Sequence, residues 1–392
     1  MITKPRVLAT LAGLIVLGGA ALAGCSSAPS SSTASSSAAS AGSAASAASA
    51  TSPLSDAAQS NPNIDLGSSL GNTPAPDFRM VDQFGQPVSL SQFRGKVVLL
   101  SFEDSECTTV CPLTTQSMVI AKELLGKAGD SVQLLGVDAN PDATSVSDVM
   151  AYSRVHGMVN EWDFVTGSVP QLKKAWSDYH IAVQVEQGDI DHTPALFVIN
   201  QQGQEQKVYL TQMSYSGVGQ AAQVIAQEVA SLLPSHPKLA SLQSLAAIPP
   251  VDPTVKATLP GADGGPQVKL GPGQPRLVVF FASWVSEVSD LPAELKVLNA
   301  YAKAAPARQL PQLTAVDETV AEPTPTAVDA FLKDAGPLAY PVGLDANGRL
   351  ADGYGVQDQP WLVLVNSAGK VTWSHDGWLS LSAIEAAAKA HP

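Results

Sequence analysis

Two cysteines four residues apart, Cys107 and Cys111, are the side chains of this sequence best suited to chemistry. Residues at this spacing lie on one face once the backbone turns helical, so the two sulfurs could form a disulfide or hold a metal together. Thiolates are soft ligands that suit Cu(I), or Zn(II) where four donors are available. The chain has 3 cysteines in 392 residues, which excludes both a four-thiolate zinc site and a disulfide scaffold.

Acidic residues crowd the first of these cysteines. Glu103, Asp104 and Glu106 come directly before Cys107. Neighbouring carboxylates disfavour a thiolate, so this setting argues against a fast thiol nucleophile while it would attract a cation. An ordinary solvated loop is the alternative reading of the same three residues.

The cysteines lie between a predicted strand and a predicted helix. The apolar run at 97–102 is typical of a buried parallel strand, and Pro112 suits the first turn of a helix that we expect to end near Leu125. Loops at the carboxyl ends of such strands are where α/β folds place their sites.

The strand and helix pattern occurs twice. Pro194 precedes Gly203 by nine residues, and Pro360 precedes Gly369 by the same distance, each pair opening a predicted hairpin that a helix follows. Alternating strands and helices predict an α/β fold with a mixed central sheet and helices on both faces. Both halves resemble the thioredoxin superfamily, and this resemblance implies that Pro194 and Pro360 are cis-prolines beside the site.

Several segments of the first half together resemble the Sco/SenC family, over about residues 75–235. They are Phe102 to Pro112, Val137 to Asp142, Val165-Thr166-Gly167 and Ile190-Asp191-His192-Thr193. The resemblance implies that Cys107, Cys111 and His192 bind one copper ion per chain, as Cu(I) or Cu(II). It also implies a metal chaperone rather than an enzyme, which delivers copper to the CuA centre of cytochrome c oxidase or maintains the thiols of that centre. Thr108-Thr109 depart from the Pro-Asp that the family usually has after its first cysteine.

The second half resembles TlpA/ResA-like thioredoxins over about residues 265–392. Phe280 to Val288 matches the segment that carries their two cysteines, but Val285 and Val288 stand at both cysteine positions. Disulfide exchange is excluded without sulfur. We expect the surface around the former site to bind a partner or to cover the copper loop, with Trp284, Trp361, Trp373 and Trp378 either serving that surface or packing in the core.

The first 60 residues predict a secretory signal followed by a tether. Lys4 and Arg6 precede an apolar run at 7–22, which is too short for a comfortable membrane span and is typical of a secretory signal. The run ends in Leu22-Ala23-Gly24-Cys25, which resembles a bacterial lipobox and implies lipidation of Cys25; an uncleaved helix is the alternative. Residues 26–60 are rich in Ser and Ala, which indicates a disordered tether. The protein is thus expected at the extracytoplasmic face of the cell membrane.

The predicted organisation is a signal peptide at 1–24, a tether at 25–70, a copper domain at 71–235, a Pro/Gly-rich linker at 236–275 and a cysteine-free domain at 276–392. A net charge of −13 disfavours nucleic acid and anionic membrane surfaces as partners. Two other functions remain open. One is a membrane-tethered thiol–disulfide oxidoreductase in which His192 handles protons, and the other is a disulfide-closed surface binding module.

Overall fold

The computed structural model describes residues 65–186, 188–239, 256–287 and 289–391, and these all fall within one compact unit. Cys25, the predicted signal peptide, most of the predicted tether and Val288 lie outside these ranges. Within them, no helix is long and apolar enough to cross a membrane.

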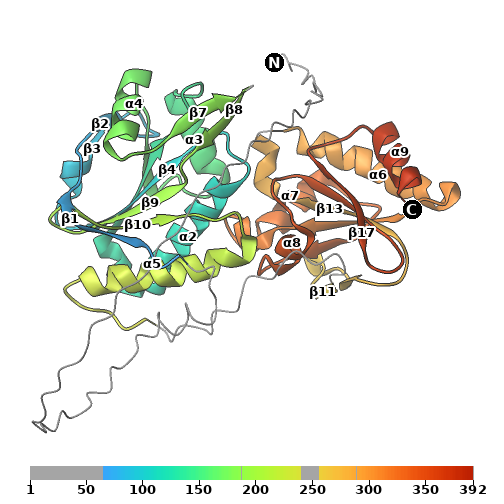
Figure 1. Cartoon of the computed structure of the whole chain (residues 1–392). Coiled ribbons are helices and arrows are strands. Elements are labelled where there is room, and N and C mark those ends of the chain that lie inside the picture. Colours follow the sequence, from blue (N-terminus) through green and yellow to red (C-terminus); the bar gives the residue numbers. More distant parts are fainter. Residues whose placement is uncertain (1–64, 187, 240–255, 288, 392) are drawn as a thin grey trace, which may run out of the picture. The chain divides into compact units, whose positions relative to one another are not determined.

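The first half is built on a six-stranded mixed sheet (Figure 1). Its strands in spatial order are β1 (Ser68–Pro74), β10 (Gln204–Leu210), β9 (Ala195–Ile199), β4 (Val97–Glu103), β5 (Val132–Asp138) and β6 (Trp162–Val165). β4, β5 and β6 run parallel, and β9 pairs antiparallel with β4. The carboxyl end of β4, where the cysteine loop begins, therefore lies beside the amino end of β9.

Side chains of β4 alternate between two cores. Val97 and Leu99 belong to a buried cluster with the helices α2 (Val110–Leu124) and α5 (Val218–Leu232). Val98, Leu100 and Phe102 belong to a second cluster, on the face covered by α4 (Val169–Asp178). Every residue of β4 is buried, which explains its continuous apolar run.

Smaller elements complete the first half. They are the hairpins β2 (Arg79–Val81) with β3 (Pro87–Ser89) and β7 (Val183–Glu186) with β8 (Asp189–His192), and the helix α3 (Val146–Val155). His192 is the last residue of β8. The folded part begins earlier than expected, because β1 starts at Ser68 and the Asp65 carboxylate accepts a hydrogen bond from the Leu210 backbone N–H at 2.7 Å.

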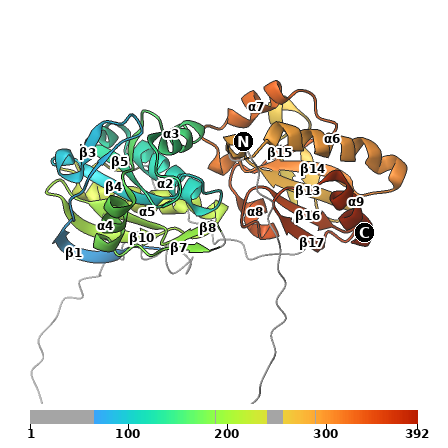
Figure 2. The same cartoon turned by 90° about the horizontal axis from the view of Figure 1, so that it is seen from above.

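The second half repeats the architecture. Its sheet has the order β15 (Val342–Leu344), β14 (Gln312–Asp317), β13 (Arg276–Phe281), β16 (Trp361–Val365) and β17 (Val371–Asp376), as Figure 2 shows. β13 is parallel to β14 and antiparallel to β16, so it matches β4 of the first sheet. The helices are α6 (Leu291–Arg308), α7 (Ala327–Ala335), α8 (Arg349–Tyr354) and α9 (Leu381–Ala390). The predicted repeat of one α/β architecture with a mixed central sheet is confirmed.

Part of the predicted linker at 236–275 is folded. β11 (Ala257–Leu259) pairs antiparallel with β12 (Val268–Leu270). Leu259, Val268 and Leu270 are buried in a core cluster of the second half. The alternation of apolar residues in these short strands outweighs the Pro/Gly-rich composition between them.

The two halves share buried surface. Leu113 of α2, together with Tyr215 and Val218 near the start of α5, belongs to the same hydrophobic cluster as Val278 and Phe280 of β13. The first half therefore depends on the second to cover one side of α2, the helix that contains Cys111.

Candidate metal centre

The cysteine loop joins β4 to α2 and places its two thiols in different surroundings. Cys111 is in the first turn of α2 and is 1% exposed, whereas Cys107 is half-buried; both thiols are free. The Cys107 sulfur accepts a hydrogen bond from the Thr109 backbone N–H at 3.4 Å and lies 3.3 Å from the Thr109 hydroxyl. The loop thus holds Cys107 at the rim and Cys111 underneath it.

His192 reaches this site from the β7–β8 hairpin. Its Nε2 lies 3.4 Å from the Cys111 sulfur, although the two residues are 81 positions apart. Its Nδ1 lies 3.2 Å from the Thr193 carbonyl oxygen, which can only accept a hydrogen bond, so Nδ1 carries the proton. Burial lowers the pKa of His192, which keeps the imidazole neutral. A neutral imidazole with Nδ1–H bonded to a carbonyl offers Nε2 as a metal ligand.

The two thiols differ in acidity. Burial raises the pKa of Cys111 well above its usual value, and the nearby Cys107, Glu103 and Asp104 add to that rise. The Cys111 thiol, acting as a hydrogen-bond donor, lowers the pKa of Cys107 and outweighs the opposing effects of burial and Asp104. The sequence predicted that neighbouring carboxylates would control the pKa of both thiols. The largest effect on the pKa of Cys111 is instead burial, and the largest effect on the pKa of Cys107 is hydrogen bonding.

Two of the three acids near Cys107 are not in a solvated loop. Glu103 is the last residue of β4 and is 0% exposed, and Asp104 is also buried; only Glu106 is exposed. The Asp104 carboxylate accepts hydrogen bonds from the Asn140 amide at 2.7 Å and from the Glu106 backbone N–H at 2.8 Å. The solvated-loop reading is therefore wrong for Glu103 and Asp104. Asp191, expected at the surface, is exposed.

Glu103 is the residue of this site that the sequence analysis placed wrongly. Burial raises the pKa of its carboxyl well above the usual value. Neither carboxyl oxygen has a hydrogen-bond partner among the described residues. Its position was predictable, because Leu99, Ser101 and Glu103 alternate along one strand and must share a face.

The three predicted ligands do not yet surround one point. Within the described ranges, no three His, Cys, Asp or Glu side chains converge closely enough to hold a metal ion as they stand. Cys111 and His192 already face each other, while Cys107 is occupied with Thr109. Two thiols and a neutral imidazole fit copper chemically. Binding would require Cys107 to exchange its hydrogen bonds with Thr109 for the metal.

The two predicted cis-prolines differ. The peptide bond between Gln359 and Pro360 is cis, whereas the bond between Thr193 and Pro194 is not among the cis bonds of the described residues. The prediction for Pro194 was wrong. The Ala195 N–H donates to the Thr193 carbonyl at 2.9 Å across this proline, so the tight turn forms around the trans bond that most prolines prefer.

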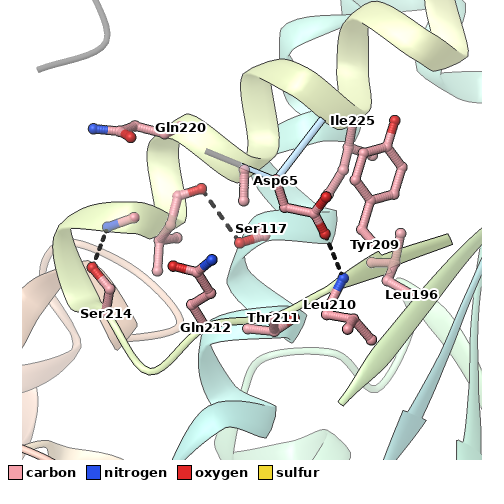
Figure 3. Close-up of a pocket in the computed structure, with 13 residues that line it drawn as sticks. Asp65, Ser117, Leu196, Tyr209, Leu210, Thr211, Gln212, Ser214, Gln220 and Ile225 are labelled. Atoms are coloured by element: carbon pink, nitrogen blue, oxygen red, sulfur yellow. Dashed lines mark hydrogen bonds between the residues drawn. The ribbon is translucent and has the colours of Figure 1, made fainter. Parts of the chain in front are cut away.

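A separate pocket lies between α2, α5 and the end of β10 (Figure 3). It has a volume of about 60 Å³ and a mainly apolar lining that includes Leu196, Tyr209 and Ile225. Cys107, Cys111 and His192 are not part of its lining. The pocket has room for about two water molecules and is separate from the cysteine loop.

The valine loop of the second half is covered. Val285 is 1% exposed and clusters with Ala282, Trp284 and Val155, the last of which ends α3. The Trp284 ring contacts the His156 ring in a tilted arrangement, with centroids 5.0 Å apart. The surface around Val285 is therefore occupied by the end of α3 of the first half, and Trp284 is a packing residue. Trp361, Trp373 and Trp378 are partly buried against the cores.

Fold and site together define a thioredoxin-like domain with a Cys-x-x-x-Cys loop and a histidine facing it. Residues 68–230 match the family model described as SCO1/SenC. This part of the chain is therefore similar to the SCO1/SenC family.

The chain is similar in sequence to proteins named SCO1 or SCO2 homologues. The chain is 28% identical over 141 residues to the mitochondrial SCO2 homologue of Danio rerio, covering 32% of this chain and 48% of that protein. It is 23% identical over 143 residues to the SCO1 protein homologue of Bacillus subtilis. This match covers 35% of this chain and 74% of that protein. The chain thus spans about half the length of the Danio rerio relative.

The chain is also similar to solved structures. Apo Sco1 from Thermus thermophilus is 28% identical with a TM-score of 0.37, covering 43% of this chain and 98% of that one. ScoI from Bradyrhizobium japonicum with copper bound is 19% identical, with a TM-score of 0.35. This match covers 41% of this chain and 100% of that one.

Proposed function

We propose that this protein binds copper as its cargo through Cys107, Cys111 and His192. The observation that carries the proposal is the 3.4 Å contact between the Cys111 sulfur and His192 Nε2, which brings a thiol and an imidazole together from distant parts of the chain. Thiolate favours Cu(I) and imidazole admits Cu(II), so the set can hold either oxidation state. The similarity of residues 68–230 to the SCO1/SenC family supports the same interpretation.

Interactions within the protein favour metal-binding protonation states of Cys107 and His192. Hydrogen bonding from Cys111 makes Cys107 the thiol that ionises more readily, and burial keeps His192 neutral. Both effects favour the protonation states that bind a metal. Because Cys107 is half-buried at the rim, a donor or acceptor of copper would meet this sulfur first.

A copper titration of the reduced protein over residues 61–392 tests the proposal. We expect one copper per chain, lost in Cys107→Ser, Cys111→Ser and His192→Ala. His180→Asn is the matched control, because His180 is exposed and has a positive φ of 57°, which Asn tolerates. Full copper retention in the three ligand variants would contradict the proposal.

We further propose that the protein is anchored by a lipid on Cys25 at the extracytoplasmic face and passes copper to the CuA centre of cytochrome c oxidase, or maintains the thiols of that centre. The lipobox-like Leu22-Ala23-Gly24-Cys25 supports the lipid anchor, and the similarity to the SCO1/SenC family supports the role at the oxidase. Cys25→Ser is expected to release the protein from the membrane fraction. In a cell lacking the native protein, loss of CuA absorbance with the other oxidase centres retained would support the role.

A thiol–disulfide oxidoreductase is the second candidate. A half-buried thiol of lowered pKa beside a buried thiol of raised pKa is an arrangement that suits attack and resolution. This function predicts disulfide reduction that survives His192→Ala and needs no copper. Copper binding lost in the same variant, without thiol exchange in the wild type, favours the copper function instead.

A further inference from the structure

A carboxyl group without a hydrogen-bond partner lies in the second half, where the first half packs against it. Glu318 comes directly after β14 and is 0% exposed. Neither of its carboxyl oxygens has a hydrogen-bond partner among the described residues. Burying an unpaired polar group costs free energy, and burying an unpaired charge costs far more. The folded protein therefore favours the neutral form of this carboxyl.

The backbone directs the Glu318 side chain toward the first half. The Glu318 N–H donates to the Phe281 carbonyl at 2.9 Å, so the parallel ladder between β14 and β13 continues through Glu318. Alternation along a strand places Glu318 on the same face as Val316. Val316 belongs to the hydrophobic cluster that joins the halves, which also contains Tyr215 and Leu113. Glu318 therefore borders the buried surface between the two halves.

The segment after Glu318 makes the contact with the first half. It forms the short helix η6 (Thr319–Ala321), which packs against α2 and against the turn before α5. Beyond η6, the Glu322 backbone carbonyl accepts a hydrogen bond from the Gln116 amide of α2 at 2.9 Å. The Glu322 carboxylate accepts hydrogen bonds from the backbone N–H and the hydroxyl of Ser283. The two glutamates thus flank the same contact, but Glu322 has partners for its carboxylate and Glu318 has none among the described residues.

The charged groups around Glu318 are negative. Burial raises the pKa of its carboxyl well above the usual value, and the charges of Asp345, Asp317 and Asp352 add to that rise. Tyr215 faces it from the first half, because the charge of Glu318 raises the pKa of the Tyr215 hydroxyl. A tyrosine is neutral or negative, so it supplies no positive charge. Ionisation of Glu318 would therefore place a further negative charge among acids at a buried interface.

We propose that Glu318 is a pH-sensitive switch of the interface: the two halves stay closed while its carboxyl is neutral and separate when it ionises. Separation would bring the carboxyl into water, where its charge is solvated. It would also uncover the side of α2 that the second half covers, so pH would control access to the helix that contains Cys111. This inference does not depend on the proposed copper function.

Rising pH favours the separated state. With the halves apart, Glu318 is an ordinary glutamate with a pKa near 4.5, whereas burial holds its pKa well above 4.5 in the closed state. The contribution of the neutral carboxyl to closure is therefore complete below about pH 4.5 and is lost as the pH rises toward the pKa of the closed state. Each pH unit between the two pKa values favours separation by up to about tenfold.

His156 acts in the opposite direction at the same interface. It contacts Trp284 of the second half, and burial lowers its pKa from 6.5 to about 3. Below about pH 6.5, protonation of this imidazole favours separation. The two residues thus limit closure from opposite sides, and we expect the interface to be tightest between about pH 4.5 and about pH 6.5.

Small-angle X-ray scattering of residues 61–392 measures the separation, and far-ultraviolet circular dichroism shows whether the halves stay folded. Between about pH 6 and about pH 9, we expect the radius of gyration of the wild type to increase without loss of secondary structure. Glu318→Gln has nearly the same shape and cannot ionise. In this variant the increase should begin at least about one pH unit higher, or be absent.

Glu186→Gln is the matched control, because Glu186 is exposed on β7 and should follow the wild type. His156→Phe should leave the alkaline increase unchanged, since it removes only the opposing titration. If Glu318→Gln fails to fold, Glu318→Met replaces it with an uncharged side chain of similar length.

Three outcomes would overturn the inference. The first is a radius of gyration that stays constant in the wild type over this range of pH. The second is an identical pH profile in the wild type and in a folded Glu318 variant. The third is an increase that occurs together with loss of the circular dichroism signal, which would indicate unfolding of the halves rather than their separation.

Discussion

Cys107 and Cys111 show how four residues of separation can give two thiols opposite properties. Cys107 lies in the loop before α2 and is half-buried, whereas Cys111 is buried in the first turn of α2. Hydrogen bonding lowers the pKa of the first and burial raises that of the second. We therefore expect the Cys107 thiol to react first and the Cys111 thiol to react after it.

Alkylation of the reduced, metal-free protein tests this difference. With iodoacetamide near neutral pH, Cys107 should be modified several-fold faster than Cys111, because the thiolate is the reacting form and the rim thiol is both more accessible and more acidic. Peptide mass spectrometry over time measures the two rates. Equal rates at both cysteines would contradict the assigned surroundings.

His156 gives a second prediction at the scale of a residue. Burial lowers its pKa to about 3, and its ring lies between Tyr152 and Trp284 with centroid distances of 4.2 and 5.0 Å. An unfolded histidine has a pKa of about 6.5, so between these values the unfolded chain binds a proton that the folded chain does not. The free energy of unfolding therefore falls as the pH falls below about 6.5, by up to about 1.4 kcal/mol per unit.

Phenylalanine at this position keeps an aromatic ring and removes the titration. Between about pH 7.5 and about pH 5, the wild type should lose about 2 kcal/mol more unfolding free energy than His156→Phe. Buried carboxylates with raised pKa values, such as Asp138 at about 8, act in the opposite sense but are common to both proteins. Urea unfolding at the two pH values measures the difference, and parallel pH profiles would refute the assignment.

Some residues of the site can be predicted from the sequence, and others cannot. Cys107 and Cys111 are visible from their spacing, and His192 from its family resemblance, and the structure brings His192 to Cys111. The burial of Glu103 was missed because acidic residues are ordinarily exposed, and this general tendency hid a strand alternation that was present in the sequence. The trans bond before Pro194 was missed because the resemblance, rather than local chemistry, suggested cis.

At the scale of elements, the contact of α8 with the segment before α5 depends on one glycine. Gly348 has a φ of +66°, and a Cβ atom there would lie 2.4 Å from the Cβ of Tyr215. The position therefore requires glycine for its backbone and for its space. The periodic strands and helices of both halves were predictable, but this contact was not, because it joins residues 133 positions apart.

A matched pair of glycines isolates the contact. Gly71 has a nearly identical φ of +68°, and a Cβ atom added there would have no neighbour within 4 Å among the described residues. Gly348→Ala should therefore lose about 1–3 kcal/mol more unfolding free energy than Gly71→Ala, the range typical of overpacking. Denaturant midpoints at equal m-values measure this. Equal losses in the two variants would mean that backbone strain alone matters.

On the scale of the whole molecule, Asp352 of α8 joins the halves. Its buried carboxylate accepts hydrogen bonds from the Ser214 hydroxyl and the Tyr215 backbone N–H, both at 2.8 Å, and from the backbone N–H and hydroxyl of Ser216. Gln116 of α2 adds a hydrogen bond to the Glu322 carbonyl at 2.9 Å. With the shared apolar cluster, these contacts predict that the described residues unfold together.

Removing the charge of Asp352 should weaken this coupling. We expect Asp352→Asn to lower the unfolding free energy by about 2–3 kcal/mol, the size of a lost charge-assisted hydrogen bond, and to split a single calorimetric transition into two. Asp334→Asn, on an exposed position of α7, is the control and should leave one transition. A single, unshifted transition in Asp352→Asn would show that the apolar cluster alone couples the halves.

The contact between the Trp284 and His156 rings has a further consequence for how the two halves stay together. Both rings belong to one chain, so the covalent connection raises the effective concentration at which each half meets the other. An interface held in this way needs little intrinsic affinity. A separately produced second half, added at micromolar concentration to the first, would therefore leave α3 and the side of α2 largely uncovered, and only the intact chain would keep the helix of Cys111 enclosed.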